Sequence, residues 1–446
     1  MAFRRILFVG YGSIGQALTP VLLQRFGYSA EQLHAVAADD DGLPIACLYG
    51  IEHTCLPLTE NNFTQVLDSK LKAGDCLINV AVEVSSIALI EWCQQRGVHY
   101  LDTCVEPWKG GYDPGAATDV VATTNYYLRE QALQLHRHGA TTAVIAHGAN
   151  PGLVTHFVKA GLRAMAKEIG IAEDIPWSQM ARCLGIKTIH IAERDSQVAN
   201  CDFAENEFAN TWSVDGFMAE AGQCAELGWG THEVQIPANG SGFEFGERSA
   251  IYLKSTGVTT VVRSWVPAVG QQNAYLIPHH EAISIAEMLT VKELSGEVAY
   301  RPTVCYAYAP CAAAVASLER WRGRELEAFV KKVPLRDELM DGADQLGVLF
   351  VFDGGAYWYG STLSLREARL LAKHNNATSM QVVAGIMGAL AWIERNPNVG
   401  VIEAETMDHE FVMEIARPFL GQVTGVWTNW QPQFVGNLCF DAFHIE

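Results

Sequence analysis

The sequence is poor in basic residues. Lys and Arg together number 31 among 446 residues, whereas Asp and Glu number 50, which leaves a formal net charge of −19. Because nucleic-acid-binding proteins carry clusters of basic side chains, this balance argues against nucleic acid as a partner. It favours cationic ligands through long-range attraction, although many soluble proteins are acidic for solubility alone, and on charge alone we prefer that interpretation.

The sequence also lacks the apolar run of about eighteen residues that a membrane-spanning helix needs. Its basic start, Met1–Arg5, resembles a signal peptide, but the apolar stretch that follows is only Ile6–Val9 and ends in glycines. We therefore interpret this stretch as a first strand and expect no membrane partner. Internal repeats and low-complexity tracts are absent as well.

No two cysteines have the C-x-x-C spacing of a zinc or redox motif. The eleven cysteines are odd in number and scattered along the chain. This usage is typical of reduced, mostly buried thiols in a cytoplasmic protein rather than of a disulfide framework or a zinc site. We expect a cytoplasmic location and no metal.

What the sequence does contain is a glycine motif in a favourable context. Gly10-Tyr-Gly12-Ser-Ile-Gly15 follows the expected strand 6–9 and precedes an apolar helical pattern over 14–26. Gly10 allows the tight turn, Gly12 lets a pyrophosphate approach the backbone, and Gly15 allows close packing of helix and strand. The start of the helix offers free N–H groups to the phosphates. The motif predicts a dinucleotide-binding domain.

The first part of the chain alternates between strand and helix. Strands are expected over 6–9, 34–38, 76–80, 99–101 and 142–146, with helices over 14–26 and 85–95. This alternation predicts an α/β fold with a Rossmann-type, doubly wound parallel sheet over residues 1–150. Functional groups are expected where the strands end, and polar side chains stand there: Asn79, Glu83, Ser85, Asp102, Thr103, Glu106 and Asn150.

An acidic run ends the second expected strand. Asp39–Asp41 stands about where an acid binds the adenine ribose in such folds, and no Arg stands beside it. This favours NAD over NADP. A solvated acidic loop explains any one of the three residues equally well.

The length of 446 residues predicts a second domain, and the pattern changes after residue 150. We expect an α+β substrate-binding domain over 151–380 that also forms a subunit interface, followed by a C-terminal helical segment over 381–446 that packs back on the first domain. Helical patterns cover 153–167, 363–374 and 380–395, and β-rich patterns cover 187–191, 250–253, 259–265, 347–352 and 357–361.

Acids and aromatics gather beside turns of this second part. The motifs are His190–Asp195, Asn210–Ser213, Glu220, Gly228–Glu233, His279–Glu281 and Phe352–Trp358. Trp is the best face for an organic cation and carboxylates are its natural counter-charges, so a cleft built from them suits a diamine. It suits a phosphate or carboxylate badly, because few Lys or Arg stand near these motifs.

Each motif has an ordinary alternative. His190 with Glu193, or His279 with Glu281, has metal-ligating residue types, but adjacent residues of a strand point to opposite faces and no third ligand motif accompanies them. Trp212 and Trp229 are ordinary core residues when taken alone.

Several of these motifs resemble the bacterial homospermidine synthase family. The resemblance rests on 101–108 (LDTCVEPW), 148–152 (GANPG), 190–195 (HIAERD), 210–214 (NTWSV), 225–233 (AELGWGTHE), 281–284 (EAIS) and 356–358 (AYW). It implies a fold similar to saccharopine dehydrogenase, formation of homospermidine from two putrescines or from spermidine and putrescine, recycled NAD, and a homodimer.

The resemblance also implies roles for individual residues. Trp212 matches the Trp beside the aminoalkyl chain, Glu193 and Glu220 the acids of the amine channel, and Asn150 and Glu106 polar contacts near the reacting end. His279 and Glu281 match the pair at the inner amine site, and Asp353 the acid at the other end. The implied cofactor residues are Gly10, Gly12, Ser13, Ile14, Gly15, Asp39, Asn79, Val80, Ser85, Thr103 and Asn150.

Two positions depart from the family pattern. The chain has His279-His280 where the pattern has one His, so the imidazole that faces the site is left open, and the acid after the second strand does not align cleanly. Two other functions stay in view. A saccharopine dehydrogenase-like oxidoreductase acting on an amino acid would need Arg or Lys for the carboxylates, and a non-catalytic NAD-binding protein would not need the converging Trp, His and acids.

Overall fold

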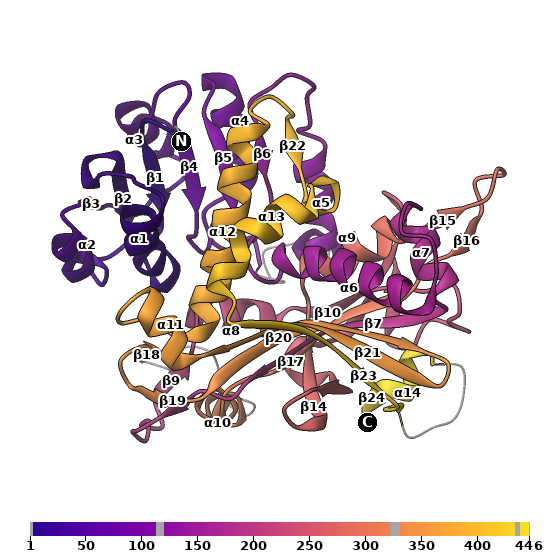
Figure 1. Ribbon diagram of the computed structural model, residues 1–446. Helices are drawn as coiled ribbons and strands as arrows, with labels where there is room; N and C mark the ends of the chain where they lie inside the picture. Colours follow the sequence, from indigo (N-terminus) through magenta and orange to yellow (C-terminus); the bar gives the residue numbers. More distant parts are fainter. Residues whose placement is uncertain (1–2, 113–119, 322–330, 433–437, 446) are drawn as a thin grey trace.

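The computed structural model describes residues 3–112, 120–321, 331–432 and 438–445. It has two large β-sheets, and the strands of the first stand above the second with their ends directed at it (Figure 1). The first sheet has the order β22-β6-β5-β4-β1-β2-β3, and all its pairs are parallel. Its strands are β1 (Ile6–Val9), β2 (Leu33–Ala37), β3 (Glu52–Cys55), β4 (Cys76–Asn79), β5 (His99–Asp102), β6 (Ala143–Val144) and β22 (Val401–Ile402). The predicted Rossmann-type sheet is confirmed.

The helices of this part are α1 (Ser13–Arg25), α2 (Leu43–Tyr49), α3 (Phe63–Lys70), α4 (Ser86–Arg96) and α5 (Asn125–Leu133). The helices predicted over 14–26 and 85–95 correspond to α1 and α4. Strand β3 had not been expected, because its sequence Glu-His-Thr-Cys has no apolar alternation and lies half-exposed at the sheet edge. Strand β6 is shorter than predicted.

The second sheet carries the order β11-β12-β10-β17-β7-β20-β21-β23. Its strands are β7 (Ile186–Asp195), β10 (Cys224–Gly228), β11 (Gly240–Gly242), β12 (Ala250–Thr256), β17 (Thr303–Ala309), β20 (Ala343–Phe352), β21 (Gly355–Ser364) and β23 (Gln422–Thr428), with β13 (Val261–Val266), β14 (Gly270–Ile277) and β24 (His444–Ile445) attached. Strands β7 and β17 are parallel neighbours, and β20 runs antiparallel to β7. Glu193 lies in register with Tyr308 on one side and Leu346 on the other.

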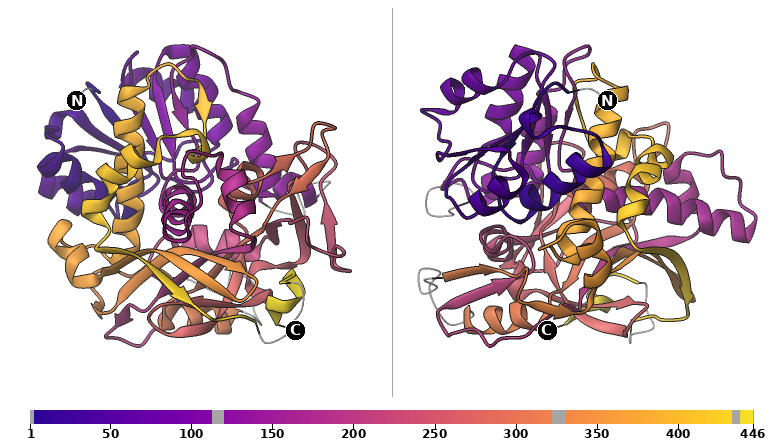
Figure 2. Two further views of the ribbon diagram at one scale, coloured as in Figure 1. Left: turned by 45° about the vertical axis from the view of Figure 1, so that its right-hand side comes forward. Right: turned by 60° about the vertical axis from the view of Figure 1, so that its left-hand side comes forward.

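Helices cover the second sheet and fill the space between the sheets (Figure 2). They are α6 (Leu153–Ile169), α7 (Trp177–Cys183), α8 (Val214–Gly222), α9 (His280–Met288), α10 (Ala312–Trp321), α11 (Leu365–Leu371) and α14 (Phe440–Phe443). Short strands complete this part: β8 (Val198–Ala199), β9 (Glu207–Asn210), β15 (Val291–Lys292), β16 (Val298–Tyr300), β18 (Lys331–Pro334) and β19 (Leu339–Asp341). The helix predicted over 363–374 is only α11, because Leu363 pairs with Asp344 as part of β21.

The last part of the chain joins both sheets. Helix α12 (Ala377–Arg395) packs on α1 and on α13 (His409–Ala416), β22 pairs with β6 of the first sheet, and β23 pairs with β21 of the second. The predicted boundary at residue 381 falls inside α12, and the segment after it contains strands besides helices. Residues 422–428 are rich in β-branched side chains, which suits a strand.

Helix α12 is long and apolar enough to span a membrane by length and composition alone, which the absence of a longer apolar run had not led us to expect. Of its apolar window, 83% is buried inside the protein. It is therefore a core helix: Ala, Gly, Val, Ile and Met face neighbours on all sides, as in other helices enclosed by a large fold.

Candidate active site

A cavity of about 130 Å³ lies between the two sheets, and it brings together residues from both halves of the chain. Its walls include Ile14, Asn79, Val80, Thr103, Cys104, Glu106, Gly148, Asn150, Glu193, Trp212, Ser213, Gly216, Glu220, His279, Tyr306, Thr378 and Val382. Ten of the residues proposed from the sequence are among them. The carboxyl ends of β4 and β5 face the second sheet here, as expected for a parallel α/β sheet.

The glycine motif has the shape that a dinucleotide phosphate requires. Gly10 has a φ of 86°, and a Cβ there would lie 2.7 Å from the main-chain N of Ala81. A Cβ at Gly12 would meet nothing within 4 Å, so this glycine faces open space at the start of α1. No side chain caps that helix, and its first turn holds no acid. Its N–H groups therefore remain free for an anion, and the residues present fit a bound dinucleotide.

Besides the three glycines, three predicted cofactor residues are not in the cavity wall. Ser85 is buried and caps α4 by accepting the Ala88 N–H at 3.3 Å. Asp39 is exposed at the end of β2, where it accepts the Asp41 N–H at 3.0 Å. Ser13 starts α1. The exposed position of Asp39 after β2 is compatible with a contact to ribose hydroxyls.

Glu193 is the central acid of the cavity. Its Oε2 accepts hydrogen bonds from the Tyr306 hydroxyl at 2.6 Å and from the Asn150 side-chain amide at 3.1 Å. Burial raises the pKa of this carboxyl to about 7, although both hydrogen bonds oppose the rise. Glu193 can therefore exchange a proton near neutral pH.

Glu106 is a second buried acid, on the other side of the cavity. Its Oε2 accepts the main-chain N–H of Glu83 at 3.1 Å. Burial raises the pKa of Glu106 to about 8, the hydrogen bond from Glu83 opposes this, and the charge of Glu220 adds to it. Glu106 is mostly protonated at neutral pH.

His279 is held between two carboxylates. Its Nε2 lies 3.0 Å from Oε2 of Glu220, and its Nδ1 lies 3.3 Å from Oε1 of Glu281. Burial disfavours the charged ring, but Glu281 and Glu220 outweigh it and raise the pKa of His279 to about 10. The imidazole is therefore a cation at neutral pH. Glu281 stands behind the ring and does not line the cavity.

The neighbouring imidazole points elsewhere. Nε2 of His280 contacts Oε1 of Glu403, and that carboxylate is also paired with Arg129 at 2.6 Å. The question left open by the sequence is therefore answered by the structure, in which His279 faces the cavity and His280 joins a buried ion cluster behind it.

Trp212 forms part of the wall on the side of α8. Its indole N–H donates to the hydroxyl of Tyr308 at 3.2 Å, and its ring lies 5.4 Å from that of Phe217. The indole is half-buried, so one part of it is left open to the cavity.

Asp353 does not join this group. It is exposed in the turn between β20 and β21, away from the cavity wall. The acid that the structure places near Glu193 is Asp344, which is fully buried on β20. Burial and the charges of Glu193 and Asp195 hold the pKa of Asp344 well above its usual range.

Sequence reasoning missed several wall residues, above all Tyr306. Its ring lies 4.4 Å from His279 and 5.5 Å from Tyr308. The alternation in Thr303–Ala309, Thr-Val-Cys-Tyr-Ala-Tyr-Ala, puts both tyrosines on one face of β17 and was the available signal. Thr378 and Val382 enter the wall from α12, which no local pattern could reveal.

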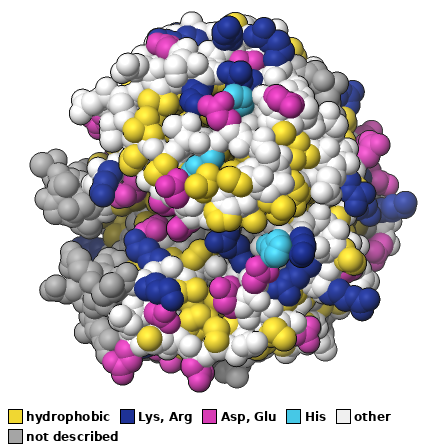
Figure 3. All heavy atoms as spheres, turned by 90° about the vertical axis from the view of Figure 1, so that its left-hand side faces the viewer, with side chains coloured by type: hydrophobic (Ala, Val, Ile, Leu, Met, Phe, Trp, Pro, Cys, Tyr) yellow, Lys and Arg dark blue, Asp and Glu magenta, His cyan; other side chains and the backbone are white. Residues whose placement is uncertain are grey.

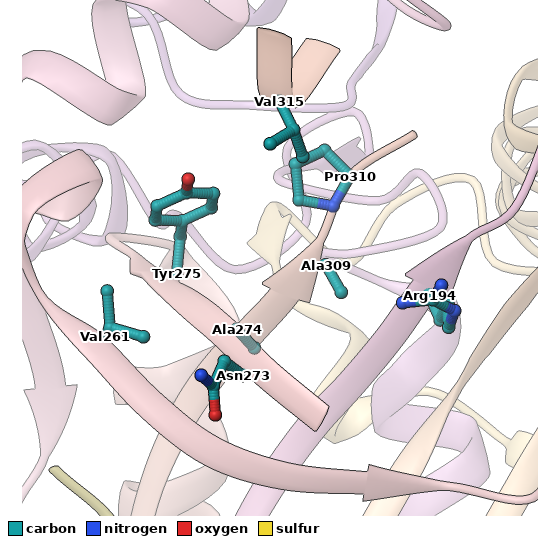
Figure 4. Close-up of a pocket in the computed structure, with 8 residues that line it drawn as sticks. All are labelled: Arg194, Val261, Asn273, Ala274, Tyr275, Ala309, Pro310 and Val315. Carbon is teal, nitrogen blue, oxygen red and sulfur yellow. The ribbon is translucent and has the colours of Figure 1, made fainter. Parts of the chain in front are cut away.

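A second hollow, of about 290 Å³, lies at the other face of the second sheet (Figure 4). Arg194 lines it, together with Val261, Asn273, Tyr275 and Pro310. Because side chains alternate along β7, Arg194 points away from the face that carries Glu193. This hollow has none of the acids of the cavity between the sheets, and we do not assign it to the reaction.

Both parts of the chain match models of known protein families. Residues 6–146 match the saccharopine dehydrogenase NADP binding domain, and residues 148–426 match the saccharopine dehydrogenase C-terminal domain. Homospermidine synthases from Blastochloris viridis and Mesorhizobium japonicum are each 40% identical over 96% of this chain, covering 92% and 91% of the relatives. The chain belongs to the homospermidine synthase family.

Solved structures agree with this family assignment. The crystal structure of homospermidine synthase from Legionella pneumophila, solved in complex with NAD, matches with a TM-score of 0.92 and 39% identity, covering 99% of this chain and 98% of that chain. Apo saccharopine dehydrogenase from Saccharomyces cerevisiae matches with a TM-score of 0.51 at 10% identity, covering 95% of this chain and 100% of that chain, which shows only a shared fold. The predicted family and fold class are confirmed.

Proposed function

We propose that this protein is an NAD-dependent aminobutyl transferase that makes homospermidine from two putrescines, or from spermidine and putrescine. The observation that carries the proposal is the composition of one cavity. The ends of the Rossmann-type strands form one wall, which includes Glu106 after β5, and Glu193, Glu220 and Trp212 of the second half form the other. Among the described residues that line it there is no Lys or Arg. The acids and the tryptophan of this site suit a diamine. His279 is the one positive side chain among the described lining residues, and it alone would repel a cationic ligand.

When bound, NAD accepts a hydride from an amine-bearing carbon of the first putrescine and returns it later to the imine of the product. Between the two transfers the amine of the second putrescine adds to the imine carbon, and ammonia leaves, or diaminopropane when spermidine is the donor. Two putrescines thus give one homospermidine and one ammonia without net oxidation. The chain's residues have to handle the protons and the charges of these steps.

Glu193 is the group we propose as the base. An amine loses a hydride readily only after its ammonium has lost a proton, and the pKa of Glu193, about 7, allows that proton to be taken at neutral pH. Glu106, with a pKa of about 8, holds a proton that it can give to the departing amine. Asn150 and Tyr306 hold the Glu193 carboxylate in place.

We propose that Trp212 and the acids beside His279 stabilise the positive charges of the substrate. The face of Trp212 stabilises positive charge that develops along the aminoalkyl chain. His279 carries one positive charge between two carboxylates, so the group of His279, Glu220 and Glu281 keeps a net negative charge for the distal ammonium. Because the cavity lies between the two sheets, a bound substrate and cofactor would displace water that could hydrolyse the imine.

Three further features belong to this proposal. The eleven free cysteines support a cytoplasmic location. The homodimer remains an expectation from the family resemblance of the sequence. We keep the division into residues 1–150, 151–380 and 381–446 as a working description of the domains. The family matches at 6–146 and 148–426 support a boundary near residue 150.

The second candidate is a saccharopine dehydrogenase-like oxidoreductase acting on an amino acid. It would need basic side chains to hold the carboxylate, and the described part of the cavity wall offers only His279, which Glu220 and Glu281 already occupy. We therefore favour the transferase.

Incubation with putrescine and NAD, followed by mass spectrometry of polyamines, tests the proposal. Homospermidine and ammonia in equal amounts, with no build-up of NADH, are the expected products. NADH formed in step with an amino-acid substrate would establish the oxidoreductase instead. No turnover of either kind by a protein that binds NAD would leave a non-catalytic role.

A further inference from the structure

Arg336 reaches from the second half of the chain to the glycine motif of the first. It stands between β18 and β19, and its Nη1 donates to Oε1 of Gln16 on α1. Gln16 follows Gly15 directly, and its main-chain N–H bonds to the carbonyl of Gly12. The guanidinium is therefore placed at the start of α1, where the dinucleotide phosphates bind in this fold.

The main chain around Arg336 is fixed from several sides. Its carbonyl accepts the guanidinium of Arg369 at 2.8 Å, and its N–H donates to Glu338 at 2.9 Å. The carbonyl of the preceding Leu335 accepts the side-chain amide of Asn376 at 2.8 Å. The loop around Arg336 is thus fixed by hydrogen bonds, and it holds the Arg336 guanidinium toward α1.

The charge of Arg336 has no carboxylate partner within the described parts of the chain. Gln16, a neutral amide, is the partner recorded there for its guanidinium. The protein has 50 acidic residues, yet none of those described forms an ion pair with this arginine at the domain boundary. A guanidinium has five N–H donors in a planar fork, so most of them stay available for a second acceptor.

The glycine motif and the helix that follows it provide no cation before Arg25. From Gly10 to Gln24 there is no Lys or Arg, and the first basic residue of α1 is Arg25 at its far end. The diphosphate would meet only main-chain N–H groups and the helix dipole from that side. Figure 3 shows the face that carries α1 and α2, where several basic side chains lie across the middle.

We propose that Arg336 completes the diphosphate site of the cofactor by donating to a phosphate oxygen from the second domain. Both domains would then hold the dinucleotide, and its release would require the two to separate. The inference rests on the proposed use of NAD and adds a binding residue outside the Rossmann-type domain. Tight retention of NAD suits a reaction in which the same cofactor gives back its hydride in each turnover.

The variant Arg336→Gln tests this inference by binding rather than by activity. Glutamine keeps a hydrogen-bonding amide but removes the charge. Arg366→Gln is the matched control. Arg366 is exposed on α11 and close in sequence, and its replacement removes the same charge. Binding is measured by calorimetry with three probes: NAD, ADP-ribose, which keeps the diphosphate, and adenosine, which lacks it.

We expect Arg336→Gln to raise the Kd of NAD and of ADP-ribose by about tenfold or more, the loss typical of a hydrogen bond to a charged group. Adenosine binding should stay within twofold, and Arg366→Gln should change nothing. The NAD that remains after dialysis should fall in parallel. Unchanged NAD binding, or equal weakening of all three probes, would overturn the inference. Failure of the parent protein to bind NAD would overturn the cofactor proposal instead.

Discussion

The indole N–H of Trp212 donates to the hydroxyl of Tyr308 at 3.2 Å, so a tyrosine that does not line the cavity helps to orient the cavity's tryptophan. Tyr308 is completely buried, and its ring stacks on Tyr306. A cation–π contact depends on how the ring faces the cation. The hydrogen bond therefore gives Tyr308 a positioning role in the proposed reaction.

A double-mutant cycle tests this role. Tyr308→Phe should lower kcat about fivefold in the parent background, since it removes one hydrogen bond and frees the indole. In the Trp212→Phe background the same change should have almost no effect, because phenylalanine has no N–H to orient. Steady-state kinetics of homospermidine formation measure both. Equal losses in the two backgrounds would mean that Tyr308 acts only through general packing.

Substitutions of Trp212 itself should be graded. Trp212→Phe keeps an aromatic face and should lower kcat several-fold. Trp212→Ala should lower it by about thirtyfold or more, as expected for a desolvated cation–π contact. The comparison uses putrescine at saturation and a thermal unfolding curve for each variant as the control for folding. Equal rates in the parent and both variants would remove the cation–π role.

The pH profile should report Glu193. Its carboxylate is the proposed base and its pKa is raised to about 7 by burial, so kcat/KM should rise with pH and level off above this value. Glu193→Gln should abolish most activity and with it this limb of the profile. A limb that persists at the same pH in the residual activity of the variant would assign it to another group.

Stability should respond to Glu193 in the opposite sense. Its pKa in the folded protein lies above the ordinary value of 4.5, so the fold binds this proton more tightly than the unfolded chain does. The stability due to this group is complete below pH 4.5 and is lost as pH rises through about 7. Glu193→Gln should therefore raise the melting temperature more at pH 8 than at pH 5. Thermal unfolding at the two pH values measures the difference, and equal shifts would contradict it.

The stability contribution of His279 should have the same pH sense as that of Glu193 over a higher pH range, but replacing His279 should destabilise the fold. Its pKa is raised to about 10 from 6.5 because Glu281 and Glu220 outweigh burial, so its protonated form stabilises the fold. This contribution is complete below pH 6.5 and is lost as pH rises through about 10. His279→Asn should be most destabilising near pH 6 and least near pH 10, as followed by urea unfolding. A cost that is the same at both pH values would show that His279 is not charged in the fold.

The glycine motif, the strand ends and the Rossmann-type sheet could be predicted because local patterns determine them. The spacing of Gly10, Gly12 and Gly15 predicts one turn between a strand and a helix. Apolar strands followed by polar residues predict a parallel sheet with functional groups at a common edge. Glu193, Trp212 and His279 were found by residue type and by the family resemblance. These residues come together because of the relative placement of the two sheets, which the sequence could not predict.

Other features of the site required tertiary structure. His279 and His280 are adjacent and of the same residue type, so the sequence does not distinguish them. The structure does, because His279 contacts Glu220 and Glu281 whereas His280 contacts Glu403. Asp353 is an attractive acid beside aromatics, yet a hairpin turn carries it to the surface, while Asp344 lies buried near Glu193. Helix α12 brings Thr378 to the cavity from a distant part of the chain.

Strand β22, Val401–Ile402, is the last strand at one edge of the first sheet. The other six strands of that sheet all lie before residue 145 in the sequence. The dinucleotide-binding sheet therefore cannot be completed on the ribosome when its own segment emerges. Its outermost strand is synthesised after most of the second sheet and before β23, so both halves reach their final form together late in translation. A shortened chain that stops before this strand would leave β6 as an unprotected edge and would be exposed to self-association.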